Sequence, residues 1–212
     1  GKQNLTEAND YFKYSALNGD PYGMLAYGRN LVMGRGTAAD VGSGIQFLSR
    51  AVEMGHTYAM NELGSMYLDG RGVEKNPERG ARFYQAALDR GDIYAMNNLG
   101  LAYLDGAGVE RDFETAMALF KKASDGGHPS APNNVGRMYF GGKGVKEDVA
   151  KAVEWYRKGA ERGDTWAASN LAWVYQNGPK KLRNEKSAAL LYGQAVSLDV
   201  YGSNAEAAVA LK

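Results

Sequence analysis

The chain has 212 residues, and its 25 Lys and Arg residues against 24 Asp and Glu residues give a net charge of +1. This balance excludes a nucleic-acid binder that works through a broad basic face, because such a protein needs clustered positive charge to displace counterions. With 44% hydrophobic residues, no cysteines and no apolar run near the roughly 18 residues of a membrane span, we expect a folded protein without disulfides or membrane insertion.

Glycine is unusually frequent, with 28 residues, and most of the excess recurs at a fixed spacing. One row of glycines, Gly28, Gly64, Gly100 and Gly136, has a period of 36 residues. Three more rows keep this period: Gly34, Gly70, Gly106, Gly142 and Gly178; Gly36, Gly72, Gly108 and Gly144; and Gly19, Gly55, Gly91, Gly127 and Gly163. Self-similarity at such a period predicts a stack of repeated units, each of which buries its apolar face against its neighbours.

Each unit predicts two helices, which the second unit illustrates. Residues 57–69 carry apolar side chains at helical spacing, and Gly70 suits the left-handed backbone just past a helix end. Asn76 is a predicted N-cap for the second helix, 77–90, which stops at Gly91. His56 and His128 stand at a helix start where other units have Asp, so we interpret them as caps rather than catalytic groups.

The period predicts that the whole chain forms one all-α solenoid domain made of several parts. The expected parts are the second helix of a truncated repeat (1–19), five repeats (20–55, 56–91, 92–127, 128–163 and 164–199) and a C-terminal capping helix (200–212). A chain that begins in the middle of a repeat is expected to be a piece of a longer or processed protein.

The repeated residues resemble the Sel1-like repeat, a relative of the tetratricopeptide repeat. The third unit shows the pattern as Ala95, Leu99, Gly100, Tyr103, Gly106, Gly108, Val109 and Asp112, and the fourth adds Trp155, Tyr156 and Gly163. The resemblance implies a right-handed superhelix of antiparallel helix pairs whose first helices line the concave side. It also implies a non-enzymatic bacterial adaptor, scaffold or inhibitor that binds another protein, such as a toxin or an envelope enzyme, and it favours the periplasm or cell envelope.

The last repeat departs from the pattern. Segment 178–183 reads Gly-Pro-Lys-Lys-Leu-Arg where the other units place a Gly-x-Gly loop. Residues 137–186 hold 11 basic and 6 acidic side chains, whereas residues 1–136 hold 13 and 16. This distribution suits either an acidic partner along the C-terminal half or a solvated surface with no role.

Function is expected where the repeats agree in geometry and differ in chemistry. One face of the first helices, at i, i+3 and i+7 spacing, lies opposite the packing stripe. The candidate partner-binding residues on it are Tyr22, Arg29, Tyr58, Asn61, Tyr94, Asn97, Leu101, Asn133, Arg137, Phe140, Trp166 and Trp173. Aromatic and Arg side chains are typical of binding hot spots, although neighbouring repeats could also cover them.

Three alternatives stay open at this stage. The asparagines Asn61, Asn97 and Asn133 could grip an extended partner chain, or they could bond between repeats and fix the pitch of the stack. Exposed Tyr and Trp would also suit a carbohydrate or peptidoglycan ligand, and the convex side or the basic loop could bind instead.

No motif for a metalloprotease, phosphate loop or nucleophile elbow is present, so we expect no enzyme, cofactor or metal site.

Overall fold

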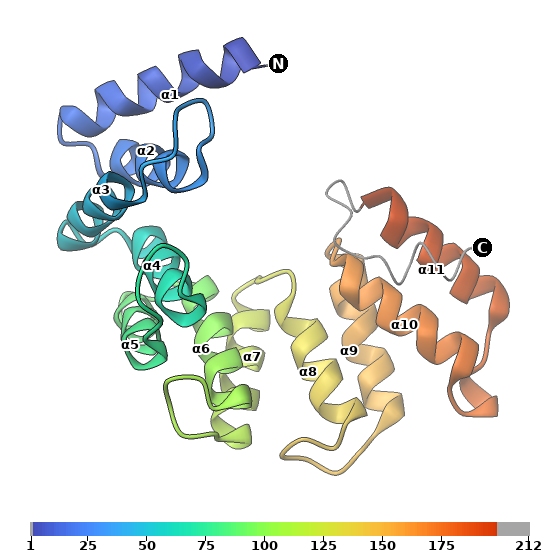
Figure 1. Cartoon of the computed structure of the whole chain (residues 1–212). Helices are drawn as coiled ribbons and strands as arrows, with labels where there is room; N and C mark the ends of the chain where they lie inside the picture. Colours follow the sequence, from blue (N-terminus) through green and yellow to red (C-terminus); the bar gives the residue numbers. More distant parts are fainter. Residues whose placement is uncertain (1, 199–212) are drawn as a thin grey trace. The chain divides into compact units, whose positions relative to one another are not determined.

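The computed structural model describes residues 2–198, which form eleven α-helices and one short 3-10 helix and contain no strand (Figure 1). The elements are α1 (Lys2–Leu17), α2 (Pro21–Met33), α3 (Val41–Glu53), α4 (Thr57–Asp69), α5 (Pro77–Leu88), α6 (Ile93–Asp105), α7 (Phe113–Asp125), α8 (Ala131–Phe140), α9 (Val149–Glu161), α10 (Thr165–Asn177), η1 (Lys180–Leu182) and α11 (Glu185–Leu198). The predicted capping helix 200–212 lies outside the described residues. The all-α class is confirmed for 2–198.

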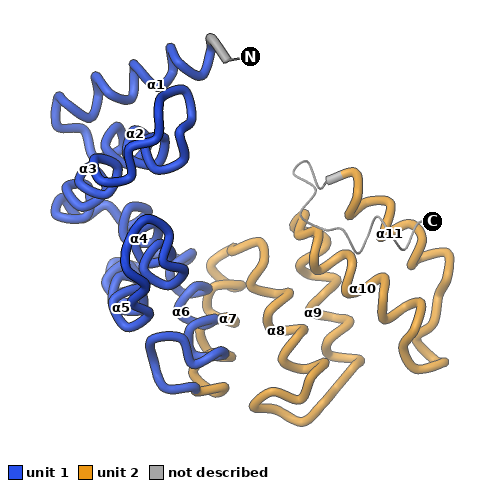
Figure 2. Tube along the Cα trace, in the orientation of Figure 1, with its two compact units in different colours: residues 1–111 blue, residues 112–212 orange. Residues whose placement is uncertain are grey.

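The chain divides into two compact units, residues 1–111 and residues 112–212 (Figure 2). The first unit contains α1 to α6, and the described part of the second contains α7 to α11. Within each unit, every helix packs against the next one along the chain. The even-numbered helices α2 to α10 are the first helices of the repeats, and the odd-numbered helices α3 to α11 are the second helices. The single-domain organisation stays a prediction.

Side-chain caps start many of the helices, and glycines end several of them. Asp92 accepts a hydrogen bond from the backbone N–H of Ala95 at 2.9 Å, and Asn76 accepts one from Arg79 at 2.9 Å. These acceptors satisfy amides that have no partner within the helix. After α4, Gly70 adopts φ 75°, a left-handed conformation that a side chain would strain. The predicted caps are therefore confirmed at these positions.

The mid-helix glycines allow the two helices of a repeat to approach closely, as the sequence predicts. A Cβ on Gly64 would lie 2.6 Å from the Tyr84 ring, and a Cβ on Gly136 would lie 2.6 Å from the ring of Tyr156. Both rings are almost fully buried. Gly64 and Gly136 thus make room for an aromatic side chain from the second helix, and Gly28 makes room for the Gly44 carbonyl and Leu48. This packing offsets the roughly 1 kcal/mol that glycine costs inside a helix.

A second glycine row closes the loop of each repeat over the preceding one. A Cβ on Gly72 would collide with Val41, the first residue of α3, and a Cβ on Gly144 would collide with Phe113, the first residue of α7. In the last repeat this position is Lys180, and the loop folds there as η1 instead. The departure noted in the sequence therefore changes the path of the chain at one place.

Candidate protein-binding face

Three tyrosines from successive first helices lie in line on the first unit. Tyr22, Tyr58 and Tyr94 are 69%, 51% and 39% exposed. The His56 ring meets Tyr22 edge-on at 4.5 Å between centroids and lies 6.1 Å from Tyr58, which in turn lies 5.8 Å from Tyr94. We call these four residues the aromatic ladder. It is a continuous row of rings that is open to solvent along most of its length.

His56 has two roles in this ladder. It is the N-cap of α4, where Nδ1 accepts a hydrogen bond from the backbone N–H of Ala59 at 3.4 Å, as predicted. Its Nε2 is buried and has no hydrogen-bond partner. Burial lowers the pKa of His56, while the nearby carboxylates of Asp20 and Asp92 raise it by less. Sequence reasoning missed its place among the tyrosines, although its position two residues before Tyr58 was a usable signal.

The His56 cap makes the stability of the first unit depend on pH. A protonated His56 cannot accept the Ala59 amide hydrogen, and its lowered pKa means that folding favours the neutral ring. The stabilisation is complete above the unfolded-state pKa of about 6.5 and is lost as the pH falls through the lower folded-state pKa. In urea unfolding at pH 7.5 and at pH 5.0, we expect His56→Asn, a cap that does not titrate in this range, to lose less stability than the wild type. Equal losses would contradict this role.

The second unit presents a different aromatic arrangement on its first helices. Trp166 and Trp173 are 43% and 47% exposed. The Trp173 ring meets Phe140 edge-on at 5.7 Å and 89°. Beside this pair lies a hollow of about 230 Å³, the tryptophan pocket, which is lined by Phe140, Tyr156, Asn170, Trp173 and Val174. Burial raises the pKa of Tyr156 to about 12.

Two of the three candidate asparagines, Asn61 and Asn133, bond to side chains of the next repeat. The Asn61 side chain donates to Asp92 at 3.0 Å and accepts from Asn98 at 3.3 Å, both in the next repeat. Asn133 accepts from Asn170 at 2.8 Å. Asn97 and Asn133 are only 6% and 7% exposed, so their expected place on an open binding surface is corrected. A buried amide needs such partners, and the neighbouring repeat supplies them.

The remaining candidates border the aromatic residues. The Arg29 side chain is 45% exposed and forms an ion pair with Glu62 at 3.5 Å. Arg137 is exposed, and Leu101 and Phe140 are half-buried. The prediction from the sequence therefore identified a face with five solvent-exposed large aromatic side chains. It included more polar residues than are exposed on that face.

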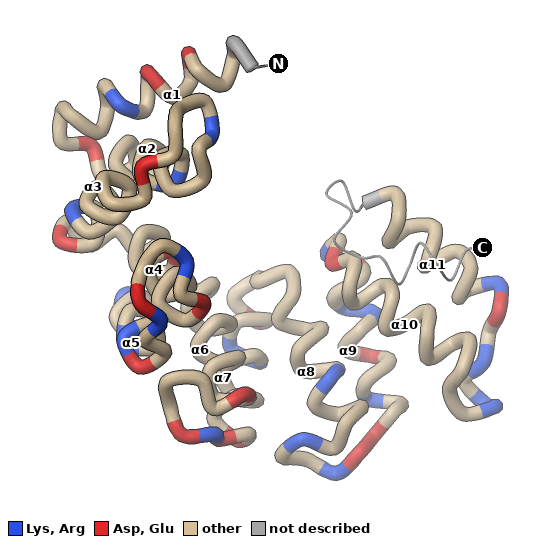
Figure 3. The backbone as a smooth tube through the Cα atoms, in the orientation of Figure 1, with Lys and Arg blue, Asp and Glu red and all other residues tan. Residues whose placement is uncertain are grey.

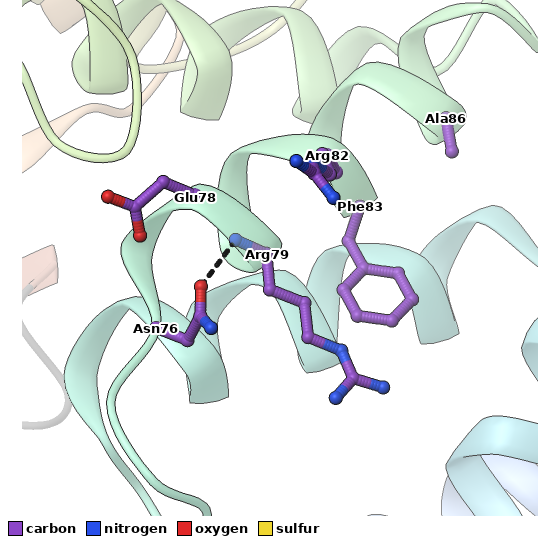
Figure 4. A pocket seen from close by; sticks show the side chains of 6 residues that line it. All are labelled: Asn76, Glu78, Arg79, Arg82, Phe83 and Ala86. Carbon is purple, nitrogen blue, oxygen red and sulfur yellow. Dashed lines mark hydrogen bonds between the residues drawn. The ribbon is translucent and has the colours of Figure 1, made fainter.

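Another pocket lies on α5, which is the second helix of its repeat. In Figure 4, Arg79, Arg82 and Phe83 of α5 line a pocket of about 540 Å³, together with Asn76, Glu78 and Ala86. The Arg79 guanidinium lies 4.3 Å from the centre of the Tyr67 ring. Much of the aromatic surface here is thus already covered by an arginine of the same unit.

Two kinds of site are absent from the described residues. Within 2–198, no group of three or more His, Cys, Asp or Glu side chains is placed to hold a metal ion. None of the helices in this part of the chain combines the length and apolar character that a membrane span requires.

A Sel1 repeat family model matches the chain six times, at residues 1–20, 21–56, 57–92, 93–128, 129–164 and 167–200. The chain therefore belongs to the Sel1 repeat family, whose members are helical solenoids that generally act as non-enzymatic scaffolds for protein–protein interaction. No curated protein matches it.

Solved structures of similar proteins agree with this assignment. A Sel1 repeat protein from Oxalobacter formigenes matches 95% of the chain and 86% of its own length, with 25% identity and a TM-score of 0.79. A protective antigen of uropathogenic Escherichia coli, c5321, matches 98% of the chain with 28% identity and a TM-score of 0.72. The present chain spans 44% of that protein. The immunity protein PA5088 from Pseudomonas aeruginosa shares the fold over 79% of the chain and 59% of its own length, at 23% identity and a TM-score of 0.56.

Proposed function

We propose that this chain binds a protein or peptide partner through the face of its first helices. The observation that carries the proposal is the aromatic ladder, in which rings from three successive repeats form one exposed row. The tryptophan pocket offers a second anchoring point on the same kind of helix in the second unit. The partner would place apolar or aromatic side chains against these rings.

The physical reason is that exposed aromatic side chains are well suited to hot spots. A Tyr or Trp side chain buries a large area on binding and loses little conformational freedom, because it has only two side-chain torsions. Here the rings are also held by one another, since each tyrosine of the ladder lies within about 6 Å of a neighbouring ring. A surface that is already ordered loses less conformational entropy on binding.

The family supports an adaptor, a scaffold or an inhibitor as the form this binding takes. A fold shared with an immunity protein is compatible with a toxin as the partner, and an envelope enzyme is a second choice of partner. A carbohydrate ligand has weaker support, because the rings of the aromatic ladder are tilted or perpendicular to one another and do not form one shared flat platform. Catalysis has no support from the titratable groups on this face.

Photo-cross-linking in cells of the native host tests where the partner binds. We expect benzoylphenylalanine at Tyr58 or Trp173 to form a cross-link with one protein species. The control positions, Arg82 and Glu154, are exposed residues on the second helices α5 and α9, and they should give none. A cross-link at Arg82 or Glu154 and none at the two aromatic positions would move the binding surface to the second helices and overturn the proposal.

A further inference from the structure

A third pocket opens in the second unit, away from the face of the first helices. It has a volume of about 660 Å³ and is bordered by three segments: the end of α8 with the loop after it, the first turn of α9, and η1. The lining residues that matter below are Tyr139, Lys146, Val149, Lys181 and Leu182. Its size is in the range of pockets that enclose a ligand group.

The last repeat, which borders this pocket, lacks a loop glycine found in the earlier repeats. In earlier repeats this glycine lets the loop lie directly over the first residue of the preceding second helix, as Gly144 does over Phe113. The corresponding position here is Lys180, and a side chain cannot be placed in such a contact. Val149 at the start of α9 has no loop glycine against it and lines the pocket, although it is partly buried.

The altered loop is nevertheless firmly held. The Asn184 N–H donates to the Tyr175 carbonyl at 2.8 Å, just as the Asp148 N–H donates to Tyr139 at 2.9 Å in the repeat before. The Arg183 side chain donates to the Gly178 carbonyl at 2.9 Å, and Leu182 packs against the core of the unit. The loop therefore starts and ends at the same repeat positions as the other loops, and these contacts hold it in place beside the pocket.

The charge around the pocket is positive. Lys151 forms an ion pair with Asp148 at 3.5 Å, so these two charges largely neutralise each other. Within residues 2–198, Lys146, Lys180 and Lys181 form no ion pair. Glu147 is the remaining carboxylate among the lining residues. Figure 3 shows these basic residues in the loop between α8 and α9 and in the segment between α10 and α11.

Part of the lining of this pocket is apolar. Tyr139, Val149 and Leu182 are all partly buried and pack against the hydrophobic cluster of this unit. The ammonium of Lys151, which is paired with Asp148, lies 5.5 Å from the centre of the Tyr139 ring. A fitting ligand therefore combines negative charge with an apolar group.

We propose that this pocket is a docking site for an acidic peptide segment of a partner protein. A bulky apolar side chain of the segment would enter between Tyr139, Val149 and Leu182. Asp or Glu residues on either side of it would pair with Lys146 and Lys181. The site lies outside the aromatic ladder and the tryptophan pocket, so it would add a second contact to whatever the face of the first helices binds.

Fluorescence anisotropy with a dye-labelled peptide tests this docking site. The probe carries a central Phe flanked by Glu residues, and binding is measured at low salt. We expect Lys146→Glu/Lys181→Glu to weaken the affinity by about tenfold or more, since two charge pairs become repulsive. The matched control, Lys13→Glu/Lys186→Glu, changes the net charge equally at exposed sites outside the pocket and should bind the probe as the wild type does.

Two further measurements distinguish binding in this pocket from general charge attraction and from binding at the aromatic ladder. Replacing the Phe of the probe by Ala should weaken binding, because the apolar walls lose their guest. Tyr58→Ala/Tyr94→Ala should bind the probe normally, so a failure of the docking site is distinguishable from a failure of the proposed function. Equal losses in the two lysine pairs, or equally tight binding of a single-stranded oligonucleotide of the same charge, would reduce the interaction to general attraction and overturn the proposal.

Discussion

Gly136→Val is expected to lower the free energy of unfolding by about 3 kcal/mol. Even the Cβ alone would lie 2.6 Å from two carbons of the Tyr156 ring, and that ring is 3% exposed. The ring cannot move aside without disturbing a core that includes Val153, Leu171 and Val174. For a chain of this length the loss corresponds to a fall of roughly 6–12 °C in the melting temperature, measurable by calorimetry.

Gly193→Val is the matched control for this substitution. Gly193 also lies inside a helix of the second unit, α11, but nothing lies within 4 Å of the place where its Cβ would stand. Valine and glycine differ in helix propensity by about half a kcal/mol, so stability should change by no more than that. Similar melting temperatures for the two variants would show that the contact between Gly136 and Tyr156 is not what makes this glycine row necessary.

The repeat period made most of the helical fold predictable. A 36-residue spacing fixes where each helix begins and ends, because caps such as Asp92 and end glycines such as Gly70 recur with it. The close approach at Gly64 also followed from the sequence, since a glycine repeated in the middle of a helix has to be offset by packing. These features are local or depend on the neighbouring repeat, which a periodic sequence describes well.

The candidate site was only partly predictable, because periodicity cannot distinguish a residue that faces solvent from one that faces the next repeat. In the numbering of the repeat, the positions of Tyr58 and Asn97 are three residues apart, yet Tyr58 is half exposed and Asn97 is buried. The difference comes from how far a neighbouring repeat reaches over each position. The same limit explains why the place of His56 in the ladder and the pocket beside Lys181 became visible only in three dimensions.

The role of the aromatic ladder predicts the largest change in binding. Tyr58→Ala/Tyr94→Ala removes two adjacent rings from the centre of the proposed surface, and truncation of one hot-spot residue typically costs about 2 kcal/mol or more. We therefore expect the dissociation constant for the cross-linked partner to rise at least about 100-fold. Both side chains are substantially exposed, so the fold should be retained, which circular dichroism can check.

The most direct test compares this variant with Tyr11→Ala/Tyr14→Ala by isothermal titration calorimetry with the purified partner. Tyr11 and Tyr14 lie on α1 and are 74% and 69% exposed. The control therefore also removes two exposed tyrosine side chains from the first unit, but these two are not part of the ladder. If the first helices carry the binding surface, the Tyr58 and Tyr94 variant loses the partner and the control binds it as tightly as the wild type. Wild-type affinity in the ladder variant would contradict the account.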